Sequence, residues 1–259
     1  MSDTSSNQSQ PNQEQTLISH LVELRTRLLH ITGCVLLIFV GLSFFASDLY
    51  SLIAKPLINH LAPGSSMIAT EVSSTFITPL KLSFYIAFFI SIPYILYQVW
   101  SFISPGLYEN ERRFILPLLF TSIVLFYSGM AFAFFIIFPL MFGFFISIAP
   151  EGVTVMTDIS RYLDFIMKIF FAFGLAFEVP VITIFLTRSG ITTVEALKRN
   201  RPYIIVGAFV VGMLLTPPDV VSQFLLALPI WCLFELGLFM ANKFSKSEGD
   251  LSQKTVDRR

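Results

Sequence analysis

The sequence predicts an all-α integral membrane protein with six transmembrane helices and both termini in the cytoplasm. Three observations predict this fold class: the composition, the lengths of the apolar runs, and the placement of Lys and Arg. Of 259 residues, 54% are hydrophobic and only 13% are charged, whereas a typical soluble domain has about 25% charged residues. The mean hydropathy is +0.74, so lipid must cover most of the surface.

The apolar runs give the spans in order, because a spanning helix needs about 20 mainly apolar residues. The six expected spans cover residues 28–45, 82–103, 117–140, 165–186, 203–215 and 220–240. The fifth, with about 13 residues, rises only about 20 Å. A short helix either thins the bilayer locally or is covered by a tilted neighbour, and the sequence leaves both open.

The run 114–148 is long for one helix and short for two, and the basic residues decide between these alternatives. With one span there, Lys and Arg gather on one side, as the positive-inside rule requires. That side receives Arg25, Arg27, Arg112, Arg113, Arg188, Lys198, Arg199, Arg201 and the basic residues of the C-terminal tail. Two spans would place residues 198–201 outside. Six spans with cytoplasmic termini are therefore expected.

Three segments lie outside the spans. Residues 1–15 are polar and lack Lys and Arg, so they predict a disordered cytoplasmic tail and not a secretory signal, which needs a basic start. Residues 243–259 form a second cytoplasmic tail. The outer segment 46–75 is too long for a plain turn, and its Leu and Ile content predicts a structured periplasmic cap with a short helix around 49–61.

Several protein classes are disfavoured by the composition. The formal net charge is zero, which points to no nucleic-acid partner. The two cysteines show no metal-type spacing and the three histidines are scattered, so no metal and no disulfide framework are expected. No phosphate-binding GxxxxGK[ST] loop occurs, and we expect no cofactor.

Two cytoplasmic stretches concentrate charge. In TLISHLVELRTRLLH, leucines at helical spacing form one apolar stripe, and Glu23 and Arg27 have the spacing of an intrahelical pair. This pattern alone favours an interfacial helix with solvated charges over a binding role. In PGLYENERRF, positive-inside anchoring explains the arginines but not Glu109 and Glu111 beside them. Such carboxylates would suit guanidinium partners, because Arg binds carboxylate bidentately.

These stretches, together with FAFGLAFEVPV and RPYIIVGAFVVGMLLTPPDVVSQFLLALPIWCLFE, closely resemble the TatC family of twin-arginine protein translocase subunits. The resemblance runs from Thr16 to Asn242. It implies a concave six-helix bundle whose cytoplasmic face binds the Arg-Arg signal peptides of folded precursors. It also implies partner subunits of the single-span TatA and TatB types, a homo-oligomer within the receptor complex, and transport driven by the proton motive force in the inner membrane.

The resemblance also assigns residues. Glu23 and Glu111 match the acidic residues of the signal-peptide surface, with Arg25 and Phe102 in or near it. Pro56 in the outer cap and Asp219 after TPP match structural or coupling positions.

Glu178 stands in the apolar stretch FGLAFEVPVI, at a depth where an ionisable group costs about 2.5–3.5 kcal/mol. One explanation is a neutral, hydrogen-bonded acid at a kink made by Pro180, which frees the carbonyl of Ala176. The explanation we favour is a functional intramembrane site, which the resemblance places on the concave face in contact with a partner. Glu235 is a second acid within a span.

Other classes remain as alternatives. An ion-coupled secondary transporter using Glu178 would need more buried polar residues and broken helices in both halves, and the sequence offers few. An intramembrane hydrolase would need a nucleophile with a base at span depth, and no GxSxG occurs. A receptor and translocase subunit without enzyme activity is the expected function.

Overall fold

The computed structural model describes residues 11–51, 67–103, 115–148, 157–216 and 219–256. Apart from two strands of two residues each, β1 (Met67–Ile68) and β2 (Thr157–Asp158), the regular structure of these residues is helical. The numbered helices are α1 (Pro11–Ser43), α3 (Ser74–Ile103), α4 (Ile115–Phe132), the π-helix η3 (Ala133–Ile137), α5 (Phe138–Ile148), α6 (Ile159–Arg188), α7 (Val194–Arg199), α8 (Arg201–Leu215) and α9 (Val220–Val256).

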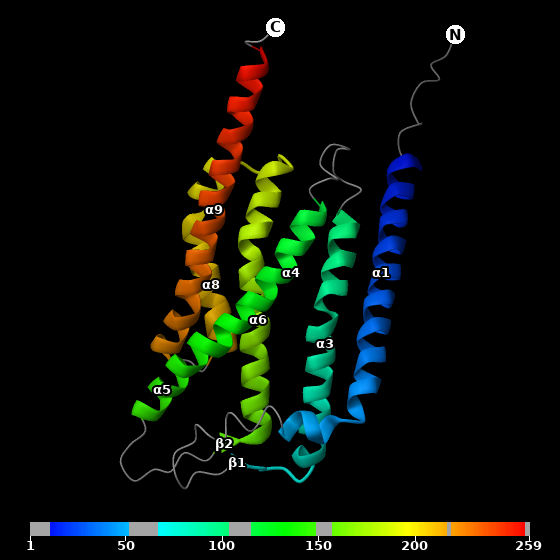
Figure 1. The fold of residues 1–259 in the computed structure, drawn as a ribbon, viewed down its shortest axis with the longest axis vertical. Coiled ribbons are helices and arrows are strands. Elements are labelled where there is room, and N and C mark those ends of the chain that lie inside the picture. Colours follow the sequence, from blue (N-terminus) through cyan, green and yellow to red (C-terminus); the bar gives the residue numbers. More distant parts are fainter. Residues whose placement is uncertain (1–10, 52–66, 104–114, 149–156, 217–218, 257–259) are drawn as a thin grey trace, which may run out of the picture.

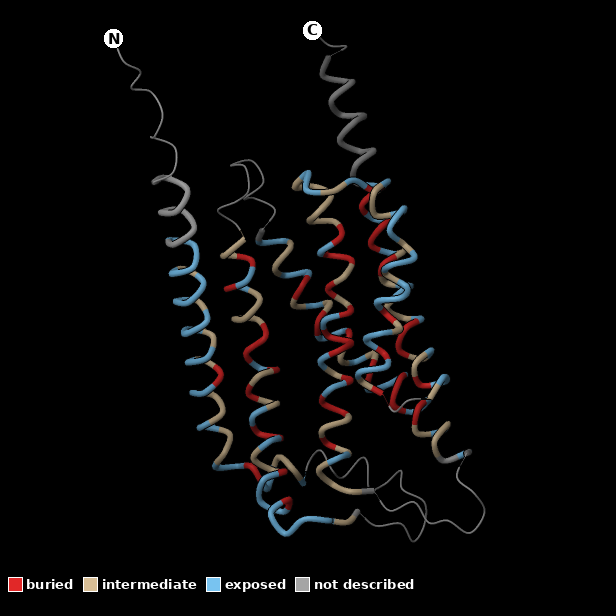
Figure 2. Tube along the Cα trace, turned by 180° about the vertical axis from the view of Figure 1, so that it is seen from behind, coloured by how far each residue is buried: buried red, intermediate tan, exposed pale blue. Residues whose placement is uncertain are grey.

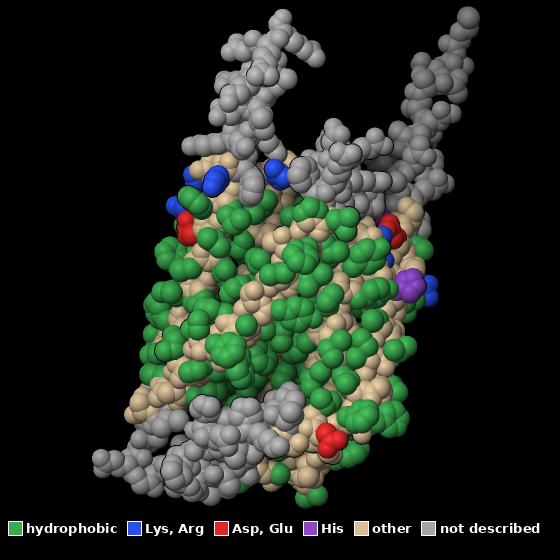
Figure 3. Space-filling view, viewed as in Figure 1, with side chains coloured by type: hydrophobic (Ala, Val, Ile, Leu, Met, Phe, Trp, Pro, Cys, Tyr) green, Lys and Arg blue, Asp and Glu red, His purple; other side chains and the backbone are tan. Residues whose placement is uncertain are grey.

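The predicted fold class is confirmed: five of the six expected spans fall within helical segments, and the first, 28–45, runs only two residues past the end of α1 at Ser43. Five helical segments of the described chain are long and apolar enough to cross a bilayer, and α8 is the shorter sixth. The first residues of α1 and the last residues of α9 lie at the same end of the bundle (Figure 1). Basic residues gather at that end (Figure 3), and α6 ends there at Arg188. A cation in the last turn also suits the helix dipole.

Some boundaries differ from the sequence expectations. Helix α1 begins at Pro11, inside the expected disordered tail 1–15, and α9 continues to Val256, well into the tail 243–259. Helix α3 begins at Ser74 instead of residue 82. Residues 46–51 are helical, which agrees with the start of the expected cap helix, while 52–66 lie outside the described residues.

The third span is one helix with an irregular middle. α4, η3 and α5 follow each other without a break, in agreement with the single span predicted from the basic residues. Proline has no N–H to donate, so Pro139 in α5 leaves the carbonyl four residues earlier without its helical partner. The π-helix ends two residues before this proline. An extra residue inserted into the hydrogen-bond ladder at this point relieves the mismatch.

The helices form an open row with α1 at one edge and α8 and α9 at the other (Figures 1 and 2). Helix α1 packs mainly on α3, and α6 packs on both α4 and α9. In the apolar stretch of α1 only 6% of the residues are buried inside the protein, compared with 44% in the apolar stretch of α6. Helix α6 is therefore the central element, and α1 offers most of its surface to lipid.

Small residues allow α4 and α6 to cross closely. A Cβ atom at Gly129 of α4 would lie 2.4 Å from the carbonyl oxygen of Phe173 in α6. A Cβ atom at Gly174 of α6 would lie 2.6 Å from the ring of Phe126. Phe126 and Phe173 are themselves fully buried. Membrane helices pack through such small residues, because lipid supplies no hydrophobic force between them.

The outer end of α6 is tied to the segment before α3. Strands β1 and β2 pair in parallel, with Ile68 opposite Asp158. The Asp158 carboxylate accepts hydrogen bonds from the backbone N–H groups of Ser160 and Arg161, and so caps α6. It also accepts from the hydroxyl and the backbone N–H of Thr70. These hydrogen bonds, led by that of the Thr70 hydroxyl, lower the pKa of Asp158 from 3.8 to about 2.

This depressed pKa predicts a pH dependence of stability. A carboxyl whose folded-state pKa is lowered stabilises the fold above its unfolded pKa, and this contribution is lost as the pH falls toward about 2. Asp158→Ala should lower the Tm in detergent by a few degrees at pH 6. The difference in Tm between this variant and the wild type should become smaller as the pH falls from 4 to 2. The matched control is Asp48→Ala, an outer-side acid whose side chain accepts no hydrogen bond among the described residues. An equal loss of Tm in both variants would contradict the capping role, and so would a loss of Tm in Asp158→Ala that does not depend on pH.

Candidate functional site

The cytoplasmic end of α1 carries an acid that already holds a guanidinium group. The Glu23 atom Oε1 accepts from Nη2 of Arg27 at 2.5 Å and from Nε at 3.1 Å. The side chain of Glu23 is 37% exposed and that of Arg27 is 19% exposed. The helical spacing predicted this pair. The structure adds that it is not simply solvated, because Arg27 lies between α1 and the end of α3.

Arg27 is held by the last turns of α3. Its Nη1 atom donates to the side-chain oxygen of Gln98 at 3.2 Å and to the Gln98 carbonyl at 3.4 Å. Its Nη2 atom also donates to the carbonyl of Ser101 at 3.2 Å. Gln98 is buried, and its amide nitrogen donates to the Tyr94 hydroxyl at 2.7 Å. A polar network therefore joins Glu23 on α1 to the cytoplasmic end of α3.

Aromatic rings border this network. Phe102 stacks on His20 with ring centroids 4.3 Å apart, and Arg27 lies 6.0 Å from the Phe102 centroid. A cation at this distance from an aromatic face is attracted by the ring quadrupole. The structure thus brings Phe102 and Glu23 together around Arg27, although they are 79 positions apart in sequence.

The two other residues predicted for the signal-peptide surface, Arg25 and Glu111, are not part of this network in the described residues. Arg25 is exposed and forms no ion pair with another residue in the described part of the chain. Glu111 lies in 104–114, outside the described residues. Helix α3 ends at Ile103, two residues after Ser101, whose carbonyl accepts from Arg27. The segment that carries Glu111 follows directly in the sequence.

Glu178 lies in a buried polar cluster between helices. Its side chain is only 5% exposed, and it stands about 15 Å from the cytoplasmic end of α6. Ser122 of α4 interacts with its carboxyl group and accepts a hydrogen bond from the indole of Trp100 in α3 at 3.1 Å. The Oε1 atom of Glu178 has no hydrogen-bond partner among the described residues. Within this chain Glu178 is therefore buried between helices, and the partner contact that the resemblance implies stays a prediction.

Glu235 lies closer to the cytoplasm than its position in the sequence suggested. Its Oε2 atom accepts from Nη2 of Arg201 at 2.6 Å, and Arg201 is the first residue of α8 at the cytoplasmic end. The pair is partly exposed, 42% for Arg201 and 30% for Glu235. Glu235 is thus an ion-paired residue that joins α8 to α9, and not a deep acid like Glu178.

Asp219 caps α9 at the outer end. Its Oδ1 atom accepts from the backbone N–H of Ser222 at 2.7 Å, while Oδ2 is buried without a partner among the described residues. Nearby, the Gln223 amide donates to the carbonyl of Phe209 and so links α9 to α8. Pro56 lies outside the described residues.

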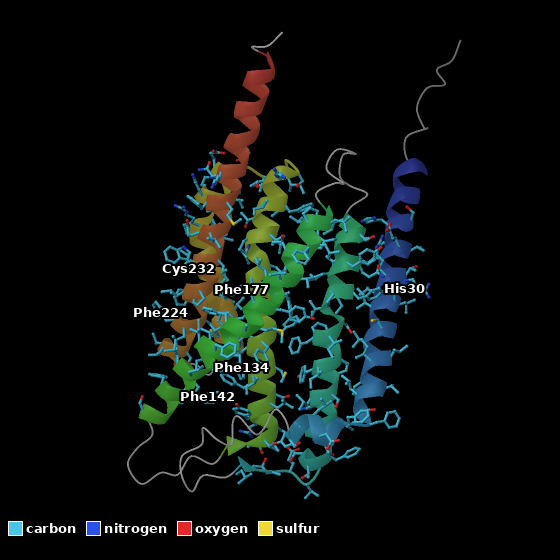
Figure 4. All side chains as sticks on the ribbon, in the orientation of Figure 1. His30, Phe134, Phe142, Phe177, Phe224 and Cys232 are labelled. Atoms are coloured by element: carbon cyan, nitrogen blue, oxygen red, sulfur yellow. The ribbon has the colours of Figure 1, made fainter. Side chains whose placement is uncertain are left out.

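Sequence reasoning missed the residues that connect these sites: Tyr94, Gln98, Trp100 and Ser122. The available signal was that Gln98 and Trp100 are hydrogen-bonding residues inside an apolar run, where such groups need partners. No group of three His, Cys, Asp or Glu that could hold a metal occurs in the described part of the chain. His30 and Cys232 lie on opposite edges of the bundle (Figure 4).

The fold and the site define a multi-span helical membrane protein with a polar, arginine-holding surface at its cytoplasmic end. Residues 19–229 match the family model described as Sec-independent protein translocase protein (TatC). The chain is 54% identical over 246 residues to the Sec-independent protein translocase protein TatC of Haemophilus influenzae, covering 95% of this chain and 96% of that protein. It is 58% identical over 227 residues to the TatC protein of Escherichia coli K12, covering 88% of each.

A solved structure described as the twin arginine translocase receptor TatC superposes with a TM-score of 0.78 and 36% identity, covering 86% of this chain and 98% of the other. The chain belongs to the TatC family. It is a subunit of the Sec-independent protein translocase in the bacterial inner membrane. The predicted family, the role as a translocase subunit and the membrane location are confirmed.

Proposed function

We propose that this chain is the receptor subunit that binds Arg-Arg signal peptides of folded precursor proteins at its cytoplasmic face. One observation carries the proposal: the Glu23 carboxylate holds a guanidinium through one oxygen and remains 37% exposed. Its other oxygen, Oε2, accepts no hydrogen bond among the described residues. A second guanidinium can therefore approach the same carboxylate from solvent. Glu111 would supply the second carboxylate, one for each arginine of the pair.

This chemistry explains a preference for arginine over lysine. A guanidinium donates through a planar fork of five N–H groups, whereas an ammonium is a compact, strongly hydrated charge. The surroundings of Glu23 already satisfy one guanidinium with carboxylate, amide and carbonyl oxygens. Phe102 adds an aromatic face beside the site, and Arg25 lies on the neighbouring exposed part of α1.

The receptor role requires partners. We infer assembly with single-span subunits of the TatA and TatB types and with further copies of this chain, and transport driven by the proton motive force. The exposed apolar faces of the outer helices offer room for such helices within lipid. The function is binding and assembly, not catalysis.

The proposal is tested by peptide binding to the purified protein in detergent. An Arg-Arg signal peptide should bind at least about ten-fold more tightly than the same peptide with Lys-Lys, the size of one lost charge-assisted hydrogen bond. Fluorescence anisotropy of labelled peptides measures both affinities at one salt concentration. Equal affinities would reject the receptor role.

The buried carboxyl of Glu178, with one oxygen unpartnered, supports an ion-coupled transporter as a second candidate. That function predicts ion uptake into proteoliposomes by this chain alone, abolished by Glu178→Gln. No uptake above that of empty liposomes would exclude it.

A further inference from the structure

We propose that Arg27 is a positioning residue for signal-peptide recognition, which holds the Glu23 carboxylate so that one oxygen stays free for the substrate arginine. The inference rests on the proposed receptor function and adds a role for a residue of this chain that does not itself bind the peptide.

The contacts of Arg27 use both edges of its guanidinium group. Nε and Nη2 donate to a single atom, Oε1 of Glu23, at 3.1 Å and 2.5 Å. Nη1 donates to the side chain and backbone of Gln98, and Nη2 also reaches the carbonyl of Ser101. A planar group with this many fixed acceptors has one orientation. The carboxylate that it contacts is therefore held in one orientation too.

The acceptors on α3 are places where a cation is stabilised. The last four carbonyl groups of a helix lack helical partners, and this end carries a partial negative charge. Ser101 is the third residue from the end of α3, so Arg27 satisfies one of these carbonyls. Gln98 is itself oriented by its hydrogen bond to Tyr94. The guanidinium is thus anchored to α3 independently of Glu23.

The same geometry argues against a different role, in which Arg27 imitates the substrate and is displaced by it. Displacement would break the contacts to Gln98 and Ser101 as well as those to Glu23. Arg27 is only 19% exposed, so little water could replace them. Because Arg27 uses only Oε1, the incoming arginine has Oε2 available without displacement.

The test is a double-mutant cycle on peptide binding with Arg27→Lys and Glu23→Gln. Lysine keeps the charge at this position, but a single ammonium cannot reach Glu23, Gln98 and Ser101 in the same fixed arrangement. Arg27→Lys should weaken Arg-Arg peptide binding about ten-fold and Lys-Lys peptide binding by less than about two-fold. The double variant should bind within about two-fold of Glu23→Gln alone, because residues that act through one another are not additive.

The matched control is Arg199→Lys, an exposed cytoplasmic-side arginine on α7, which should leave both affinities unchanged. The Tm of every variant is measured in the same detergent, so that binding is compared only between folded proteins. A purely structural role for Arg27 would lower the Tm without changing the Arg-Arg to Lys-Lys affinity ratio.

Three results would overturn the positioning role while the wild type still prefers Arg-Arg. Tighter binding by Arg27→Lys would show a displaced internal ligand. Fully additive losses in the double variant would show that Arg27 contacts the peptide itself. Unchanged binding by Arg27→Lys would show that Glu23 needs no positioning. A wild type that does not distinguish the two peptides would instead reject the receptor function on which the inference rests.

Discussion

Gly129→Ala should destabilise the protein by about 2–3 kcal/mol, although it adds only one methyl group. The new Cβ would lie 2.4 Å from the carbonyl oxygen and 2.9 Å from the carbonyl carbon of Phe173. Both atoms belong to the backbone of α6, so no side-chain rotation relieves the overlap and the two helices must move apart. Overpacking of this kind typically costs about 1–3 kcal/mol.

The control is the same substitution on a helix with free space. A Cβ at Gly207 of α8 meets no atom within 4 Å. Gly207→Ala should therefore stabilise the protein slightly, because Ala is favoured over Gly by about 0.8–1.0 kcal/mol in a helix interior. The two changes are chemically identical and are predicted to have opposite signs.

Thermal melting in one detergent, at one scan rate, measures this difference. For a chain of this size, the loss at Gly129 corresponds to a fall in Tm of roughly 5–10 °C. A Gly129→Ala variant as stable as the wild type would mean that α4 and α6 separate without cost, and that their close crossing contributes little to the bundle.

The spans and their orientation could be predicted from sequence because they depend on properties that are local in the chain. A run of about 20 apolar residues is visible in the sequence itself, and the cytoplasmic side follows from summed Lys and Arg. Even the ambiguous run 114–148 was settled in this way. The π-helix within it depends on Pro139 and on how the neighbouring turns accommodate that residue, so its position could not be foreseen.

The binding network could be predicted only in part. Glu23 and Arg27 are four residues apart, and their pairing follows from helix geometry. Gln98 is 71 positions from Arg27, and only the packing of α1 on α3 brings them together. The same limit applies to Glu178, because its distance from the helix end indicates depth but not which way the side chain points. Its burial beside Ser122 depends on the crossing of α4 and α6.

Glu235 shows how a correct span can give a wrong depth. The residue lies within the apolar run 220–240, so it was grouped with Glu178 as an intramembrane acid. The partner is decisive: Arg201 opens α8 at the cytoplasmic end, and their contact of 2.6 Å fixes Glu235 at that level. An ion pair at the end of a span carries much less desolvation cost than an isolated acid at its centre.

Glu23→Gln combined with Glu111→Gln should abolish measurable Arg-Arg selectivity and weaken signal-peptide binding by about 100-fold or more. Each change replaces an anionic acceptor with a neutral amide, and each charge-assisted hydrogen bond contributes about 1.5–3 kcal/mol. Losses at two carboxylates that bind different guanidinium groups should add approximately. Glutamine keeps the size of the side chain, so the packing around Arg27 is largely preserved.

The affinities of the wild type, both single variants and the double variant for Arg-Arg and Lys-Lys peptides test this directly. Glu195→Gln is the matched control, since Glu195 is an exposed acid in the first turn of α7. Each single variant should retain part of the selectivity, because one carboxylate still meets one arginine. If Glu23→Gln alone removed all selectivity, the two acids would act as one site and the assignment of one arginine to each carboxylate would be wrong. If the double variant kept the wild-type preference, the arginines would be recognised elsewhere on the cytoplasmic face.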